Sequence, residues 1–203
     1  MPLLHPALLG LSPAASTPPR ADEASGPAPL AAAIPPGLAD VLAGWPGVAG
    51  LLHDEGEPVG LATLGELARR LAGAQRLWRP VIRHDPQRRW YTRLLLSGVV
   101  EVWLIGWAPG QGTAVHDHGG ALGALAVAAG AVEEDVHDEA GPGGWEPVTT
   151  RRYGTGHVAR FGAEHVHRVV NRQPVPATTV HAYSPPELPL RYSPEPPLAM
   201  VAS

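Results

Sequence analysis

The sequence predicts a mainly β protein, an antiparallel barrel or sandwich that follows a short N-terminal helical segment. Glycine and proline account for 24 residues each among 203, which favours many turns and short strands over long helices. From residue 90 onward, β-rich runs of strand length follow one another too closely to leave room for crossover helices. A hydrophobic fraction of 44% is sufficient for a folded core.

Helical periodicity is confined to the region before these runs. A short helix is predicted to begin near Pro36, where apolar residues recur at helical spacing. A second helix is predicted to begin at Thr63, because Thr63 and Glu66 have the spacing of a capping box. Gly73 is the predicted end of this second helix.

The chain is expected to divide into four regions. These are a mobile Pro/Ala-rich tail at residues 1–35, a helical segment at 36–82, the barrel with its metal site at 83–192 and a C-terminal tail at 193–203. The predicted strands lie at residues 90–96, 99–107, 113–118, 122–129, 131–136, 147–152, 157–161, 165–170 and 177–183.

Composition and charge exclude several classes of function. The chain contains no cysteine, which removes disulfides, thiolate metal sites and a cysteine nucleophile. A net charge of -4 and the lack of a long basic run argue against nucleic acid as the partner. No apolar run approaches the ~20 residues of a membrane-spanning helix, and the N-terminus lacks the basic start of a secretory signal. We therefore expect a soluble, cytoplasmic protein.

Seven of the ten histidines lie between His116 and His181, and three of them indicate a metal site. His116 and His118 are two residues apart, so on a strand their rings share one face and suit two cis positions on one ion. His167 lies in a later β run and completes a set of three imidazoles if the sheet closes into a barrel. Imidazole suits iron, zinc, copper and nickel alike, which leaves the metal open. Two alternatives also stay open: a pair of polar residues on a solvated strand, and His165 in place of His167 as third ligand.

The glycines around these histidines have a spacing that resembles the two signature motifs of the cupin superfamily, whose members are small β-barrels (jelly rolls) holding one metal. The first motif reads Gly110-x5-His116-x-His118-x4-Gly123-x6-Gly130, and the second Gly156-x5-Gly162-x4-His167-x3-Asn171. Gly123 stands where the first motif usually has a glutamate ligand, and Gly162 and Glu164 replace the usual proline and glycine of the second. The resemblance therefore implies a metal with three histidine ligands, no carboxylate, and open positions for substrate and dioxygen.

Within this superfamily the chain resembles the cysteine dioxygenase (thiol dioxygenase) family over about residues 85–190. The matching segments, in the family's order, are Tyr91-Thr92-Arg93, His116-Asp117-His118, His167-Arg168-Val169 and the run Thr-Val-His-Ala-Tyr-Ser-Pro-Pro at 179–186. The resemblance implies a mononuclear ferrous ion, Fe(2+), held by His116, His118 and His167. It also implies a small aminothiol, L-cysteine, as the substrate, O2 as the second substrate and cysteine sulfinic acid as the product.

The resemblance assigns roles to four further residues. Arg93 binds the substrate carboxylate as a bidentate fork, and Tyr91, two residues earlier on the same strand face, adds a hydroxyl to the pocket wall. Tyr183 points at the iron-bound substrate, and His181 orients its hydroxyl group. From the residues alone, a surface position for Arg93 and a barrel-filling role for Tyr183 stay open. Arg191 is a second candidate for the carboxylate.

Three smaller expectations follow from the same family. Many animal members crosslink the tyrosine to a cysteine, but Gly123 stands at that position, so no thioether is expected. Asp117 is expected to point to the opposite face of the strand from its two neighbours, with a structural or ligand-supporting role. The Ser184–Pro185 bond is expected to be cis.

Other functions stay open at this stage. Relatives that act on 3-mercaptopropionate carry glutamine in place of Arg93, which favours L-cysteine. A dioxygenase of another small thiol is nevertheless the alternative, because all 15 basic residues are arginine and a single arginine is weak evidence. A non-catalytic metal-containing cupin that binds a small molecule needs the histidines but neither Arg93 nor Tyr183. A metal-free barrel needs none of them. Family members are often monomers, and we expect the same here.

Overall fold

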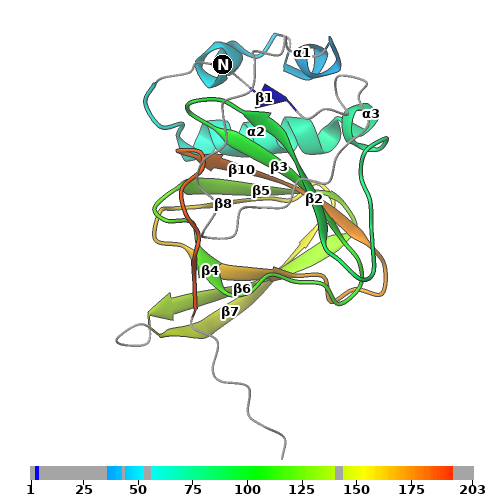
Figure 1. The fold of residues 1–203 in the computed structure, drawn as a ribbon, viewed down its shortest axis with the longest axis vertical. Coiled ribbons are helices and arrows are strands. Elements are labelled where there is room, and N and C mark those ends of the chain that lie inside the picture. Colours follow the sequence, from blue (N-terminus) through cyan, green and yellow to red (C-terminus); the bar gives the residue numbers. More distant parts are fainter. Residues whose placement is uncertain (1–2, 5–35, 43, 53–55, 140–143, 194–203) are drawn as a thin grey trace, which may run out of the picture.

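The computed structural model describes residues 3–4, 36–42, 44–52, 56–139 and 144–193. Two antiparallel sheets face each other, and the N-terminal helices cover the outer face of one of them (Figure 1). This arrangement confirms the predicted mainly β fold with a short helical segment. The expected tails lie outside the described residues, except for Leu3–Leu4, which pair with a strand, and Ser193.

The larger sheet has six strands in the order β1-β2-β3-β10-β5-β8. Their bounds are β1 Leu3–Leu4, β2 Trp90–Leu96, β3 Glu101–Trp107, β5 Leu122–Ala129, β8 Val158–Phe161 and β10 Ala177–Ser184. The smaller sheet has five strands in the order β11-β4-β9-β6-β7. Their bounds are β4 His116–Asp117, β6 Ala131–Glu139, β7 Trp145–Gly154, β9 Val166–Val170 and β11 Arg191–Tyr192. Each predicted run overlaps one of these strands, although β4 covers only residues 116–117 of the run 113–118. The strands β1 and β11 were not predicted.

The helical segment contains α1 (Pro36–Leu42), the 3-10 helix η2 (Pro46–Leu51), α2 (Leu61–Gly73) and α3 (Gln75–Trp78). The predicted capping box is wrong: α2 begins two residues before Thr63, with Gly60 as its N-cap and no side-chain cap. The Glu66 carboxylate instead accepts hydrogen bonds from Arg69 at 2.7–2.8 Å and from Arg70 at 2.6 Å. Residues three and four apart are neighbours on a helix surface, and this pairing therefore competes with a cap. None of the described helices is long and apolar enough to cross a bilayer.

Two apolar cores follow from the alternation of side chains along the strands of the larger sheet. On the outer face, strand residues such as Leu104, Val180 and Ala182 pack against the buried face of the helices. On the inner face, Trp107 and Leu125 pack with residues of the smaller sheet such as Val132 and Val169, and this second core fills part of the barrel. Inward-pointing residues of both sheets therefore meet inside the barrel, where the predicted site residues also lie.

Candidate metal centre

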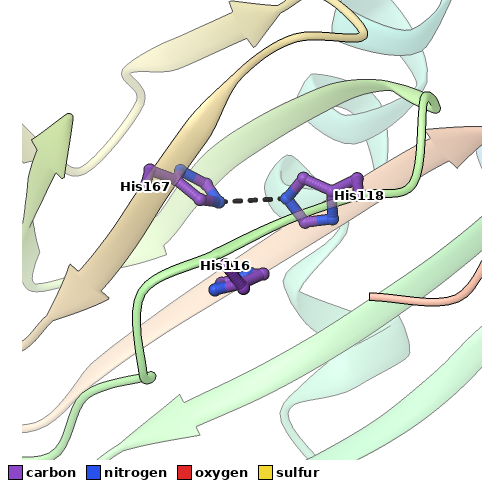
Figure 2. A group of neighbouring side chains, drawn as sticks. All are labelled: His116, His118 and His167. Carbon is purple, nitrogen blue, oxygen red and sulfur yellow. Dashed lines mark hydrogen bonds between the residues drawn. The ribbon is translucent and has the colours of Figure 1, made fainter. Parts of the chain in front are cut away.

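The structure brings the three predicted histidine ligands together from two adjacent strands. His116 opens β4, His118 follows that strand directly, and His167 on β9 is the pairing partner of His116. Figure 2 shows the rings of His118 and His167 facing each other, with the ring of His116 beside them. Their ring centroids lie 4.9, 5.0 and 5.1 Å apart, and all three side chains are buried. The three rings thus form a nearly equilateral group.

The spacing of the nitrogens fits a metal ion. Nε2 of His118 lies 3.0 Å from Nε2 of His167. Two imidazole ligands at about 2.1 Å from an ion and at right angles to each other are separated by about 3.0 Å. One ligand atom from each of the three residues lies within 4.8 Å of the others. The residues present therefore suit a metal bound on one face by three neutral ligands.

The second nitrogen of two of these rings is held by a hydrogen bond. Nδ1–H of His116 donates to the carbonyl of Ala114 at 2.9 Å, and Nδ1–H of His167 donates to Oε1 of Glu134 at 2.7 Å. The proton is therefore on Nδ1 in both rings, which leaves the Nε2 lone pairs directed at the centre. Such partners fix both the tautomer and the orientation of a ligand.

Glu134 is a buried carboxylate on β6 with three donors. Besides His167, it accepts hydrogen bonds from Nε2–H of His165 at 2.9 Å and from the hydroxyl of Tyr153 at 2.6 Å. Burial opposes ionisation of Glu134, but the hydrogen bonds from His165 and His167 outweigh it and hold the pKa of Glu134 below its usual range. Glu134 therefore remains ionised and supports the β9 ligand from behind.

Burial keeps the three candidate ligands neutral at physiological pH. It lowers the pKa of His116 to about 4, with a further contribution from His167. It also lowers the pKa of His118 well below its usual value, and that of His167 despite the opposing Glu134. Neutral imidazole is the form that binds a metal, so no proton has to be displaced from a charged ring.

His165 was the alternative third ligand. Among the described residues, two groups have a geometry that suits a metal, and His167 belongs to both: one with His116 and His118, the other with Glu134 and His165. His165 points its Nε2 at Glu134 and belongs to the second group only. His167 therefore joins the histidine pair of the first cupin-like motif to the second motif, and His165 does not.

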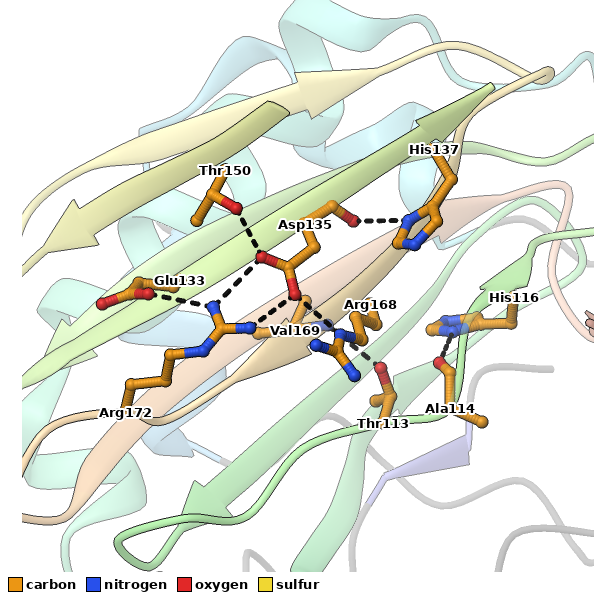
Figure 3. A network of polar contacts seen from close by, with 10 residues as sticks. All are labelled: Thr113, Ala114, His116, Glu133, Asp135, His137, Thr150, Arg168, Val169 and Arg172. Carbon is orange, nitrogen blue, oxygen red and sulfur yellow. Dashed lines mark hydrogen bonds and ion pairs between the residues drawn. The ribbon is translucent and has the colours of Figure 1, made fainter. Parts of the chain in front are cut away.

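A polar network on the outer face of the smaller sheet holds the ligand strand β9 in register (Figure 3). Asp135 on β6 accepts from Thr150 of β7 at 2.7 Å, from Arg168 of β9 at 2.7 Å, and from Arg172 at 2.6 and 3.1 Å. Arg172 also contacts Glu133 at 2.9 Å. Adjacent residues of a strand point to opposite faces, so this network anchors β9 from outside while the ligand points inward.

The segment before β4 is tied to the same strand. Thr113 bonds to Val169 twice: its N–H donates to the carbonyl at 2.9 Å, and its hydroxyl accepts from the N–H at 3.0 Å. The next residue, Ala114, accepts from the ring of His116 (Figure 3). These bonds position His116 relative to β9 through the backbone.

A chain of four side chains leads from the barrel core to Tyr183. Nε1–H of Trp107 donates to the hydroxyl oxygen of Thr179 at 2.8 Å, because an indole nitrogen can only donate. The Thr179 oxygen lies 2.9 Å from Nε2 of His181, which is the acceptor available to its hydroxyl proton among the described contacts, so the hydroxyl donates to Nε2. Burial lowers the pKa of His181 to about 3, so the ring is neutral and its one proton is on Nδ1. Nδ1–H donates to the Tyr183 oxygen at 3.0 Å.

This order of donors leaves the phenolic proton of Tyr183 for another acceptor. The Tyr183 ring lies 4.5 Å from the ring of His118, measured between centroids, so the residue borders the histidine group. Burial raises the pKa of Tyr183 far above its usual value, which keeps the phenol protonated. Tyr183 is therefore a hydrogen-bond donor at the edge of the centre, set in place by His181.

Gly123 and Phe161 explain the departure from the usual first motif. Gly123, Tyr183 and Phe161 occupy one row across β5, β10 and β8. A side chain at Gly123 would overlap the Phe161 ring. That ring stacks on His118 with centroids 5.3 Å apart and lies 5.1 Å from the ring of His167. An aromatic ring therefore fills the space in which a carboxylate ligand or a crosslinking cysteine would lie.

Arg93 lies on the inner face of the larger sheet, in one row with Trp103 of β3 and His181 of β10. Its Nη1 contacts Oε1 of Glu187 at 2.7 Å and Oε2 of Glu101 at 3.6 Å, and its guanidinium lies 5.2 Å from the Trp103 ring centroid. Its side chain is half-buried. The partners of Arg93 in the structure are thus the carboxylates of Glu187 and Glu101, and its binding of a substrate carboxylate stays a prediction. Tyr91 packs its ring edge against Trp103.

Arg89, just before β2, was not among the predicted site residues but lies near them, because its charge contributes to the lowered pKa of His116 and of His181. Its guanidinium lies 5.3 Å from the Trp107 ring centroid, and its Nη1 donates to the carbonyl of Gly112 at 2.5 Å. Within the described part of the chain, its buried Nε has no hydrogen-bond partner. Residues 89, 91 and 93 are each two apart, which is the spacing of side chains on one face of a strand. This spacing is the sequence signal that could have identified Arg89.

Asp117 and Arg191 have a structural arrangement. Oδ1 of Asp117 accepts from the N–H of Gly119 at 2.8 Å, and Oδ2 pairs with Arg191 at 2.7 Å. Asp117 therefore anchors β11 to β4, and the structure places Arg191 on this carboxylate. The Ser184–Pro185 peptide bond is cis, as the resemblance implied.

Comparisons with known proteins show which family the chain belongs to. The model of the family "Cysteine dioxygenase type I" matches residues 65–192. Similar solved structures include a Klebsiella pneumoniae protein with a double-stranded β-helix domain (20% identity, 58% of this chain and 94% of that one, TM-score 0.48). They also include a cupin superfamily protein from Desulfitobacterium hafniense (12% identity, 53% and 86%, TM-score 0.43) and an oxalate oxidase in complex with glycolate (15%, 53% and 56%, TM-score 0.43). Since the family model spans more than half of the sequence, this chain belongs to the cysteine dioxygenase type I family.

Proposed function

We propose that the protein is an iron-dependent thiol dioxygenase that adds both atoms of O2 to the sulfur of L-cysteine and forms cysteine sulfinic acid. The observation that carries the proposal is the convergence of three neutral imidazoles beside an ordered Trp107–Thr179–His181–Tyr183 chain, in a member of this family. A metal-free structural barrel does not account for three buried imidazoles that converge on one another, whereas the hydrogen bonds of their outer nitrogens are expected of any buried ring.

His116, His118 and His167 would hold Fe(2+). When bound, the iron supplies a site for the thiolate and the electron transfer that lets dioxygen react with it. The protein would contribute three neutral ligands and no carboxylate. Glu134 and the carbonyl of Ala114 keep two of the ligands in the required tautomer.

The substrate is oriented by residues of the larger sheet. Arg93 offers a guanidinium fork for the carboxylate, and Tyr91 lies on the same strand face and lines the same wall. Tyr183 would donate a hydrogen bond from its phenol to the reacting sulfur or oxygen atoms, and His181 fixes the direction of that donor. Phe161 excludes water from the side of the centre that faces His118 and His167.

Metal analysis and product analysis of one purified preparation test the proposal. We expect about one iron per chain, oxygen uptake on addition of L-cysteine, and cysteine sulfinic acid as the product, with little of either iron or activity in His116→Ala. Faster turnover of 3-mercaptopropionate than of L-cysteine would identify 3-mercaptopropionate as the substrate instead. Stoichiometric iron without oxygen uptake on any small thiol would favour a non-catalytic binding module. Purified protein that contains no metal would favour a metal-free structural barrel.

A further inference from the structure

The guanidinium of Arg93 already has a carboxylate partner from the protein itself. Oε1 of Glu187, on the segment after β10, lies 2.7 Å from Nη1 of Arg93. This is the distance of a charge-assisted hydrogen bond, the contact that a bound substrate carboxylate would make with the same nitrogen. Glu187 thus occupies Arg93 with a carboxylate, the same group that Arg93 is proposed to bind in the substrate.

Two carboxylates, those of Glu187 and Glu101, contact Arg93, and they differ in their distance from it and in their exposure to solvent. Glu101 lies farther away, at 3.6 Å, and its buried carboxylate also accepts from Nε1–H of Trp103 at 2.9 Å. The Glu187 side chain is 60% exposed, so it can turn into solvent without leaving a buried charge behind. Glu187 is therefore the partner that an incoming carboxylate can replace.

The backbone directs Glu187 toward this position. Its N–H donates to Oε1 of Glu101 at 3.1 Å, and its φ of 59° lies in the left-handed region that residues other than glycine rarely adopt. Such a conformation persists where the surrounding contacts determine it. The backbone of Glu187 is therefore held beside Glu101, and only its side chain has to move when its carboxylate leaves Arg93.

We propose that Glu187 is a specificity-determining residue, an internal carboxylate that occupies Arg93 in the empty site and that the carboxylate of the substrate displaces. It imposes a cost on thiols whose carboxylate takes its place at Arg93, and none on a thiol without a carboxylate. The inference rests on the proposed function, because it takes Arg93 as the carboxylate receptor.

Equilibrium binding to the iron-loaded protein under nitrogen tests this role with L-cysteine and with cysteamine, which lacks the carboxylate. Glu187→Gln is expected to lower the dissociation constant of L-cysteine by at least about threefold, the size expected for removal of an exposed ion pair. The constant for cysteamine should change by less than about 1.5-fold. Glu146→Gln makes the same charge change at an exposed position of β7 and should leave both constants unchanged.

A double variant ties the effect to Arg93. In the Arg93→Gln background, Glu187→Gln should no longer improve L-cysteine binding, because there is no guanidinium left to release. Unchanged or weaker L-cysteine binding by Glu187→Gln, equal gains for both thiols, or the same gain without Arg93 would each overturn the inference. Tighter binding without any sulfinate formation by the parent protein would remove the proposed function and leave this inference standing.

Discussion

Oε1 of Glu134 accepts the Nδ1 proton of His167 at 2.7 Å, and this buried pair links the metal centre to the middle of the smaller sheet. Loss of the carboxylate should loosen the orientation of the ring and allow the proton to move to Nε2. We expect Glu134→Gln to weaken metal binding by about 10- to 100-fold, the usual effect of removing such a partner.

Competition with a chelator measures this affinity without reference to turnover. Glu133→Gln is the matched control, because the neighbouring carboxylate contacts Arg172 on the other face of the same strand and not the ligand. An unchanged affinity in Glu134→Gln, or an equal loss in both variants, would show that the carboxylate does not position His167.

The hydroxyl of Thr179 determines which nitrogen of His181 is protonated. Thr179→Val removes the donor to Nε2, so the ring proton can move to Nε2 and Nδ1 can then accept a hydrogen bond from the Tyr183 phenol. We expect kcat for sulfinate formation to fall by roughly tenfold, at the lower limit of a proton-positioning effect, with KM and iron content unchanged. Thr179→Ser keeps the hydroxyl and should restore most of the rate. A loss in KM alone, or no rescue by serine, would contradict the donor order.

Gly123 is needed because the Phe161 ring occupies the space above it. Gly123→Ala should lower the free energy of unfolding by about 1–3 kcal/mol, the usual effect of overpacking a core. Gly154→Ala on β7 meets no atom within 4 Å and serves as the control, with an effect of at most about 0.5 kcal/mol. Thermal and denaturant unfolding measure both. A Gly123→Ala protein as stable as the control would show that the ring moves aside at no cost.

Much of the scaffold could be predicted because its signals are local. Strands such as β2, β5 and β10 are β-rich runs bounded by turn residues, and the two-residue spacing of His116 and His118 puts their rings on one face wherever a strand forms. The predicted capping box is wrong because its signal is also only local. Thr63 and Glu66 have the right spacing, but the arginines one turn later bind the Glu66 carboxylate. Local spacing does not rank competing partners.

The supporting residues of the site could not be predicted, since their partners are distant in sequence. Glu134 lies in the acidic run 133–135, which has the composition of a solvated strand. Only the pairing of β6 with β9 shows that Glu134, the middle residue of this run, points inward at His167. Glu187 is 94 residues from Arg93, and nothing local marks either as the other's partner. Arg89 carried a usable signal in its alternation with Tyr91.

Asp135 should make the stability of the smaller sheet depend on acidity. The hydrogen bonds from Arg172, and then those from Thr150 and Arg168, hold the pKa of Asp135 well below its usual value near 4, although burial opposes them. A carboxyl whose pKa is lower in the folded state stabilises the fold above its unfolded pKa and loses that contribution as the pH falls toward the folded value. The stabilisation is therefore complete at neutral pH and declines below about pH 4.

Urea unfolding of Asp135→Asn and the parent protein at several pH values measures this contribution. Hydrogen bonds to a charged group contribute about 1.5–3 kcal/mol, and we expect a loss near the lower limit because both guanidinium groups are partly exposed. The difference in free energy of unfolding should be constant from pH 8 to 6 and shrink between about pH 4 and 2. Asp138→Asn, on the same strand, is the matched control for the loss of one carboxylate. A difference that stays constant down to pH 2 would mean that Asp135 supports β9 through its shape and neutral hydrogen bonds, and not through its charge.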